Sequence, residues 1–376
     1  MANIIMTTSP TVEETPEIKE AVTTFEIAPA NGLSKLRDKS EEIQSKCTDT
    51  LLRNVDLSTL AVYCSPNQTT LAKYRNDKSE PVREKTFMDY AFSQFCSKLG
   101  VPAQYLMKCM KEGYEDLAEY NLNAWIDNYS GSLFMREYDD KIRGVLSARY
   151  SPFDTPQILD VVNDTTRGMG LKVKGYFMSP ERFHARLIQT ETMNIDGEDL
   201  FGGIQIDSSD VGRSALTVNF FIFKQICTNG LCVSRGKGNL FTQKHINICT
   251  DDFREELSTS IKLLPELVAE YESTIKRARI SNSLVTVGSN DVSSLIATEL
   301  NKTEERNKLV QELIDRLRAK TKLTDEGAEK VLRVATGKYN YSDWGIVNAI
   351  TEVAQDYTLE RRIELEKIAA NILRAV

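Results

Sequence analysis

The chain has 376 residues, 41% of them hydrophobic and 27% charged, and a formal net charge of -7 at pH 7. This composition supports a sizeable core and argues against global disorder. The acidic balance gives no general attraction to nucleic acid or to an anionic membrane, so a polyanion site has to be a local patch. The length favours two domains or one elaborated domain.

No apolar run approaches the roughly 20 residues that a membrane-spanning helix needs. The N-terminal stretch MANIIMTTSPTVEETPEIKE lacks the basic region of a signal peptide. The seven cysteines are odd in number and lie mostly in apolar patterns, as is typical of reduced thiols. We therefore expect a cytoplasmic protein without membrane association, cofactor or bound metal.

The pattern of apolar residues divides the chain into four parts. Residues 1–30 are rich in Thr, Glu and Pro, which is typical of a flexible tail. A mainly helical N-terminal part is expected over 31–130, a β-rich core over 131–255 and a helical C-terminal part over 256–376. The predicted fold class is α+β, with a central, mostly antiparallel sheet flanked by helices.

The N-terminal part carries helical periodicity. Residues 84–99 repeat apolar side chains every four positions, which indicates an amphipathic helix and a core-facing aromatic stripe. Gly100 is expected to end this helix, and Pro102 suits the first turn of the next. Two other helices are predicted over 34–47 and 114–127. The segment 50–80 is mixed, and loops are predicted at 65–70 and 74–81.

After residue 130 the apolar pattern changes to alternation. It predicts a hairpin over 131–150 with its turn at Asp139–Asp140. Further strands are predicted at 171–177, 182–190 and 200–207. Between them, Thr155 at the N-cap and Pro156 behind it predict a helix that Gly168 ends. We interpret Arg149 and Asp154 as an ion pair that closes the corner before this helix.

The stretch from Arg213 to His245 contains the longest strand pattern. Two sets of residues alternate along it, namely Leu216, Val218, Phe220, Ile222 and Ile226 on one side, and Thr217, Asn219, Phe221, Phe223 and Gln225 on the other. Both sets contain large apolar groups, so this strand is expected to be covered at least in part on both faces. A turn follows at Asn229–Gly230.

The same region is free of acidic residues. From Val211 to Thr250 there is no Asp or Glu, whereas five basic residues occur, at 213, 224, 235, 237 and 244. The segment RGKGN at 235–239 combines cations with glycines that let backbone amides approach an anion, although it lacks the P-loop pattern. Two interpretations stay open, a polyanion site and a plain solvated hairpin loop.

Four potential metal ligands follow the spacing C-x4-C-x12-H-x3-C, which is near that of zinc sites: Cys227, Cys232, His245 and Cys249. Two of the cysteines lie in apolar runs, and no helix is predicted to bring the histidine back. Zinc binding stays open as an alternative.

No sequence motif of an enzyme is present. His184 and His245 are the two histidines, and neither lies in a nucleophile motif such as GxSxG. We predict no catalytic residue, and a dispersed site lined by Arg149, Asp154 and His184 is the enzymatic alternative.

Towards the C-terminus the pattern is again helical. A long helix over 252–279 is expected to kink at Pro265. Other helices are predicted over 291–300, 303–319, 324–336, 342–356 and 359–374. Gly337 is expected to cap one of them and Ser342 to start the next.

Three segments occur in the order VLSARYSPFDTPQILDVV (145–162), FKQICTNGL (223–231) and WGIVNAITEVAQ (344–355). With LGVPAQYLMKC (99–109) and NLNAWID (121–127), they resemble the phage- and plasmid-encoded proteins gathered as domain of unknown function 932, over residues 85–375. The resemblance implies a mixed α+β core and a mobile-element protein of a bacterial cytoplasm. The family-type positions are Arg149, Tyr150, Asp154, Cys227, Asn229, Trp344 and Asn348.

The leading hypothesis is a non-enzymatic nucleic-acid-binding protein that binds or anneals single-stranded DNA in replication or recombination. Lys and Arg side chains would bind the phosphate backbone of the DNA, and a tyrosine would stack on a base, as in other single-strand-binding grooves. The predicted contacts are Arg143, Arg149, Tyr150, Lys224, Arg235, Lys237 and Lys244. The alternative is a host-interaction or counter-defence factor that binds a protein, and a homo-oligomer is compatible with both.

Overall fold

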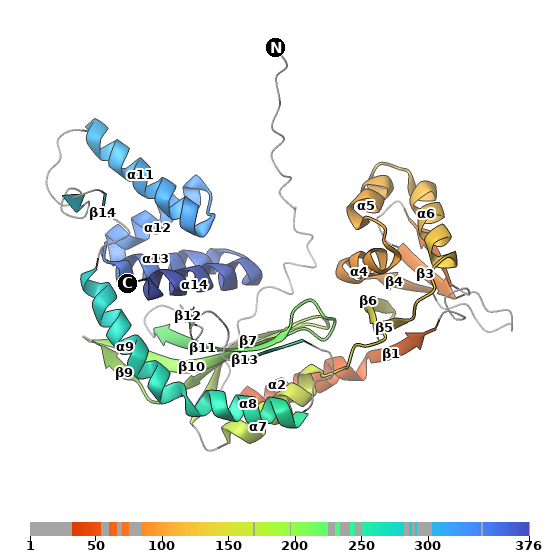
Figure 1. Ribbon diagram of the computed structural model, residues 1–376, viewed down its shortest axis with the longest axis horizontal. Coiled ribbons are helices and arrows are strands. Elements are labelled where there is room, and N and C mark those ends of the chain that lie inside the picture. Colours follow the sequence, from red (N-terminus) through yellow and green to blue (C-terminus); the bar gives the residue numbers. More distant parts are fainter. Residues whose placement is uncertain are drawn as a thin grey trace, which may run out of the picture.

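The computed structural model describes residues 32–53, 60–65, 70–74, 84–167, 170–195, 197–224, 230–233, 241–244, 250–281, 286–287, 290–291, 303–339 and 341–375. In these ranges the chain forms two large sheets with helices packed on them (Figure 1). The α+β class, the antiparallel sheets and the helical C-terminal region are confirmed. The tail predicted over 1–30 lies outside the described residues.

The first sheet, sheet A, has the strand order β1-β5-β6-β4-β3-β2. Its strands are β1 (Cys47–Leu52), β2 (Leu60–Cys64), β3 (Thr70–Tyr74), β4 (Glu84–Phe87), β5 (Leu133–Tyr138) and β6 (Lys141–Ser147). All neighbours pair antiparallel except β4 and β6, which are parallel. The predicted hairpin is confirmed as β5 and β6, and its turn holds Asp139 at a φ of 50°, a left-handed conformation that Asp adopts more readily than most residues.

Three helices pack on sheet A: α4 (Asp89–Leu99), α5 (Ala103–Lys111) and α6 (Glu115–Asp127). The helix predicted from residue 84 begins only at Asp89, because Glu84–Phe87 is strand β4. Phe87 still reaches the helical stripe, since its ring stacks on Phe95 at 5.1 Å between centroids. Gly100 ends α4 at a φ of 74°, as predicted.

The second sheet, sheet B, has the order β12-β11-β10-β8-β7, with β13 paired to β11 and β9 to β10. Its strands are β7 (Leu171–Met178), β8 (Phe183–Gln189), β9 (Met193–Ile195), β10 (Glu198–Ser208), β11 (Leu216–Lys224), β12 (Gly230–Val233) and β13 (Phe241–Gln243). Every pairing is antiparallel. The strands predicted at 171–177, 182–190 and 200–207 are confirmed as β7, β8 and β10.

Sheet B lies between two helical layers (Figure 1). On one face, Phe220 of β11 meets Tyr271 of α9 at 5.5 Å between ring centroids. On the other face, Arg186 of β8 binds Glu366 of α14. Strand β11 is covered on both faces, because Val218 and Asn219 point to opposite sides and are both buried, as the alternation predicts.

The remaining helices pack with sheet B. They are α2 (Gly32–Ser45), α7 (Thr155–Thr166), α8 (Thr250–Lys262), α9 (Leu264–Ile280), α11 (Thr303–Thr321), α12 (Asp325–Lys338), α13 (Asp343–Val353), the 3-10 turn η1 (Ala354–Asp356) and α14 (Leu359–Arg374). A short two-stranded sheet is formed by β14 (Thr286–Val287) and β15 (Asn290–Asp291). Only Asp291 of the helix predicted over 291–300 is described, and it lies in β15.

Several predicted helix ends differ from the structure. Asp154, not Thr155, caps α7, and it forms a capping box with Gln157. The helix predicted over 252–279 is two helices, and Pro265 lies in the first turn of α9, where its missing amide leaves no bond unmade. Gly337 lies inside α12 rather than capping it. Ser342 caps α13 as predicted, since its hydroxyl accepts from the Gly345 amide at 3.1 Å.

Two separate hydrophobic cores accompany the two sheets. The core of sheet A runs from Leu52 to Val145 and includes α4, α5 and α6, whereas the core of sheet B contains Leu36 of α2 and the residues from Phe153 onwards. The boundary predicted at 130/131 therefore divides sheet A, because β5 and β6 pair with the earlier strands. The part over 31–130 also holds four strands in addition to its helices.

Candidate functional site

Arg143 is one of the predicted nucleic-acid contacts, and it is fully buried. It is the extra residue of a β-bulge, because Arg136 pairs with Gly144 and Glu137 with Ile142. Its guanidinium donates to the Pro180 carbonyl at 2.5 Å. A buried arginine bound to the backbone offers no cation to a polyanion, so this position is corrected from a surface contact to a structural residue.

Tyr150 also has a packing role. Its ring stacks on Phe134 at 5.9 Å between centroids, with the Arg136 guanidinium 5.7 Å from its centre. Its hydroxyl donates to the Asp210 carbonyl at 2.7 Å, and burial raises the pKa of this hydroxyl above its ordinary value. The residue is half-buried, and its ring contacts Phe134 and Arg136, so base stacking by Tyr150 stays a prediction.

The other predicted cations lie in different parts of the chain. Arg149 is exposed after β6 of sheet A, and Lys244 is exposed after β13 of sheet B. Lys224 is the last residue of β11. Arg235 and Lys237 lie outside the described residues.

The two ends of the undescribed stretch 234–240 are both on the edge of sheet B. Val233 of β12 pairs with Phe220 of β11, and Phe241 of β13 pairs with Val218. The described residues on either side of this stretch therefore pair with positions of β11 that are two residues apart.

An ionic cluster lies where the two sheets meet, and it consists of the buried Arg136, Arg143, Asp154 and Asp210 together with the exposed Asp49. The side chain of Arg136 has no exposed surface and donates to both carboxylate oxygens of Asp154 at 2.6 Å. It also donates to both oxygens of Asp49 at 2.9 Å and to the Asp210 carbonyl at 2.6 Å. Such two-pronged pairing satisfies a buried guanidinium.

This cluster corrects the predicted partner of Asp154. The carboxylate binds Arg136 of β5, together with Gln44 of α2 at 3.1 Å, and not the exposed Arg149. Because Arg136 belongs to sheet A while Asp154 caps a helix of the sheet B core, the ion pair joins the two cores.

The cluster holds three carboxylates against two guanidiniums. Burial, followed by the charge of Asp154, raises the pKa of Asp210 to about 6. The Asp210 carboxylate lies 3.7 Å from Arg143 and accepts from the Thr155 hydroxyl at 3.1 Å. These contacts offset the burial only in part.

Replacing Asp210 by Asn is expected to flatten the dependence of stability on pH. The native state binds the Asp210 proton more tightly than the unfolded chain does. The stabilisation of the native state by this proton is therefore complete below pH about 4, and it is lost as the pH rises through about 6. A shift from 3.8 to about 6 corresponds to about 3 kcal/mol. Urea unfolding of the wild type and of Asp210→Asn at several pH values between about 4 and about 6 measures this difference in the free energy of unfolding. The exposed Asp164→Asn variant is the control, and an unchanged pH profile in Asp210→Asn would contradict the assignment.

A second polar group crosses the face of sheet B that α14 covers, and it consists of His184, Arg186, Gln205, Asp207 and Glu366. Arg186 donates to Gln205 at 2.9 Å, and Gln205 donates to Asp207 at 2.9 Å. Burial lowers the pKa of His184, so the imidazole is neutral near pH 7 and its Nδ1 donates to Asp207 at 2.7 Å.

The His184–Asp207 pair is not accessible to a substrate. His184 has no exposed surface. The structure also separates the three residues of the enzymatic alternative, since Arg149 is exposed, Asp154 binds Arg136 and His184 lies inside sheet B.

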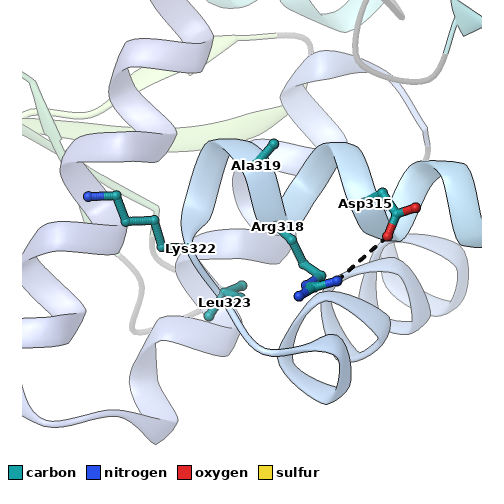
Figure 2. A pocket seen from close by; sticks show the side chains of 5 residues that line it. All are labelled: Asp315, Arg318, Ala319, Lys322 and Leu323. Carbon is teal, nitrogen blue, oxygen red and sulfur yellow. Dashed lines mark ion pairs between the residues drawn. The ribbon is translucent and has the colours of Figure 1, made fainter. Parts of the chain in front are cut away.

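An open hollow of about 360 Å³ lies beside the junction of α11 and α12 (Figure 2). Its lining residues are Asp315, Arg318, Ala319, Lys322 and Leu323. Arg318 pairs with Asp315 at 3.7 Å and with Asp325 at 2.8 Å, while Figure 2 shows Lys322 directed away from the Arg318–Asp315 pair. Two carboxylates neutralise the guanidinium, so the hollow is not built to hold an anion.

The potential zinc ligands are described only in part. Among the described residues, no three His, Cys, Asp or Glu side chains gather closely enough to hold a metal ion. Cys232 lies in β12, whereas Cys227, His245 and Cys249 lie outside the described ranges. In those same ranges, no helix has the length and apolar composition needed to cross a membrane.

A protein-family model matches the part of the chain that contains sheet B. The model of the family described as Domain of unknown function (DUF932) matches residues 143–376, which hold sheet B and the helices that cover it from α7 onwards. The chain belongs to this family, as its resemblance predicts. No curated protein and no solved structure matches the chain.

Proposed function

We propose that the protein binds nucleic acid, without catalysing a reaction, along the edge of sheet B formed by β11, β12 and β13. The supporting observation is that β12 and β13 both pair with β11 within the 40-residue stretch that contains no Asp or Glu. A basic edge of this kind attracts phosphates although the whole chain is acidic.

The contacts in this proposal are chiefly to phosphates. Arg235 and Lys237 fall in the sequence between β12 and β13, which both pair with β11, and Lys244 is exposed just beyond β13. Arg213 contributes less to the proposed phosphate contacts, because its guanidinium lies 3.6 Å from the Glu181 carboxylate and over the ring of Tyr90. Tyr150 is half-buried against Phe134 and bonded to the Asp210 carbonyl, so the proposal does not depend on base stacking by that ring.

Single-stranded DNA is the favoured ligand, and replication or recombination of a phage or plasmid in a bacterial cytoplasm is the favoured setting. A narrow basic edge follows one flexible strand more easily than it spans a duplex. A duplex arm and an RNA arm in the binding experiment separate these ligands.

The affinity for a labelled single-stranded oligonucleotide is expected to fall as salt rises from about 50 to about 300 mM. Each single-strand phosphate contact contributes about -0.7 to the slope of log affinity on log salt. Removing two contacts with Arg235→Ala and Lys237→Ala should therefore make the slope shallower by about 1.4. Fluorescence anisotropy at several salt concentrations measures both quantities.

The matched control removes two exposed lysines of α5, Lys108→Ala with Lys111→Ala, which lowers the net charge equally but away from sheet B. This control should weaken binding less than the Arg235 and Lys237 pair does. The proposal fails if the wild-type chain does not bind at low salt, or if both double variants lose the same affinity.

A further inference from the structure

Helices α5 and α6 expose an unusual number of large apolar side chains. Of the eight such residues that are exposed in the described part of the chain, five lie between positions 105 and 125. Their exposed fractions are 47% for Tyr105, 61% for Tyr114, 44% for Leu117, 74% for Tyr120 and 51% for Trp125. Isolated exposed apolar residues are ordinary, but a gathered group marks an interaction surface.

The geometry of α6 places most of this group on its outer side. Ala118, Leu122 and Ile126 repeat every four residues and are buried against sheet A. Asn123 fixes the helix to β2, because its side chain accepts from the Val62 amide at 2.9 Å and donates to the Val62 carbonyl at 2.8 Å. The inner side of α6 is thus fully used by the fold.

The outward residues, which we name the aromatic strip, are Tyr114, Leu117, Tyr120 and Trp125. Tyr114 caps α6, and Leu117 and Tyr120 follow at intervals of three, which places the three side chains next to one another on the helix surface. Trp125 follows Leu117 by eight residues, about two turns, and forms the far end of the strip. Tyrosine and tryptophan are the residues that contribute most to protein interfaces.

Acidic residues surround the aromatic strip. Between Lys111 and Arg136 the chain has no Lys or Arg, whereas it has five acids, Glu112, Glu115, Asp116, Glu119 and Asp127. Glu119 accepts from the Cys64 amide at 3.2 Å, while Glu112, Asp116 and Asp127 are exposed. This acidic rim repels phosphates and a second copy of the same surface, and attracts cations.

We propose that the aromatic strip and its acidic rim dock a protein partner that presents a basic amphipathic segment. The apolar side of such a segment would cover Leu117 and Tyr120, and its Lys or Arg side chains would reach the acids and the ring faces of Tyr and Trp. The surface precedes residues 143–376, which match the family, and Figure 1 shows α5 and α6 well away from β12 and β13. The proposal is therefore independent of nucleic-acid binding by sheet B.

The test uses the full chain and a labelled amphipathic peptide of Leu and Lys at helical spacing. The wild-type chain is expected to bind it, and Tyr120→Ala with Trp125→Ala should weaken binding at least about tenfold. Glu112→Lys with Asp116→Lys should weaken it similarly and make the remaining binding less sensitive to salt. The control variant Leu51→Ala with Ile280→Ala removes two exposed apolar residues elsewhere and should bind like wild type.

Tryptophan fluorescence gives a second measurement. The chain has two tryptophans, exposed Trp125 and buried Trp344. Adding the peptide should shift the emission of the wild-type chain to shorter wavelength, and Trp125→Phe should abolish the shift.

Equal binding by the Tyr120 and Trp125 double variant would overturn the proposal. It would also be overturned if a peptide with Glu in place of Lys bound as well. The side chains altered in the peptide-binding variants are exposed, so these variants are expected to keep the wild-type circular dichroism spectrum: Leu51, Glu112, Asp116, Tyr120, Trp125 and Ile280.

Discussion

The Asp154→Ala variant is expected to lose about 3–5 kcal/mol of its free energy of unfolding, because it leaves a buried guanidinium short of a partner. Arg136 has no exposed surface and gives two of its bonds, each of 2.6 Å, to Asp154. The same variant removes the N-cap of α7, which costs about 1 kcal/mol by itself. Urea unfolding followed by circular dichroism measures the loss.

Two other variants separate the ion pair from the helix cap. Asp154→Asn keeps a capping side chain but not the charge, so its loss should be smaller than that of Asp154→Ala but still large. Asp160→Ala removes a half-exposed partner of Arg37, and it should cost less than about 1 kcal/mol. A loss for Asp154→Ala no larger than that of Asp160→Ala would show that the ionic cluster does not stabilise the fold.

The Glu366→Leu variant is expected to lose a comparable 3–5 kcal/mol for the same physical reason. Glu366 is fully buried and binds both Arg186 of β8 and Arg362 of its own helix. Without it, the 2% exposed side chain of Arg186 keeps its hydrogen bond to Gln205 but loses its carboxylate partner.

The double variant Arg186→Met with Glu366→Leu should be more stable than Glu366→Leu alone. It removes the buried guanidinium together with its carboxylate partner. Apolar replacement of a whole buried ion pair often leaves the free energy of unfolding nearly unchanged. Arg362, whose side chain is 11% exposed, can turn towards solvent. Unfolding free energies of the wild type, both single variants and the double variant form the cycle that measures this coupling. Losses of unfolding free energy that simply add in the double variant would contradict this coupling. The control is Glu364→Leu, which removes one member of the exposed pair Arg361–Glu364.

The spacing of apolar residues predicted the helices and strands in which this spacing repeats over a long stretch or clearly alternates. Strands β7, β8, β10 and β11 and the C-terminal helices repeat their apolar residues over seven or more positions, so their type and place followed from the sequence. Strands β1 to β4 are only four to six residues long and are separated by polar segments. Their place in sheet A depends on pairing with β5 and β6, which no local pattern reveals.

The candidate site was harder to predict, because a cation in a strand has the same local signature whether it is exposed or buried. Arg143 follows the alternation of β6 until the bulge turns it inwards. One local signal was present in Gly144, where an added Cβ would meet Val211 at 2.9 Å, since such a close approach marks an interior position. Arg136 was missed because its partner Asp49 lies 87 residues away in the chain.

The pair of Arg186 and Glu366 has a consequence for how the chain is made. Its two members are 180 residues apart, so at about 5–20 residues per second the ribosome needs roughly 10 to 40 s to supply the second after the first. During that interval sheet B holds a strand arginine without its acidic partner, and α14 is still being synthesised. A helix that is made after every strand of sheet B therefore completes the charge balance of that sheet.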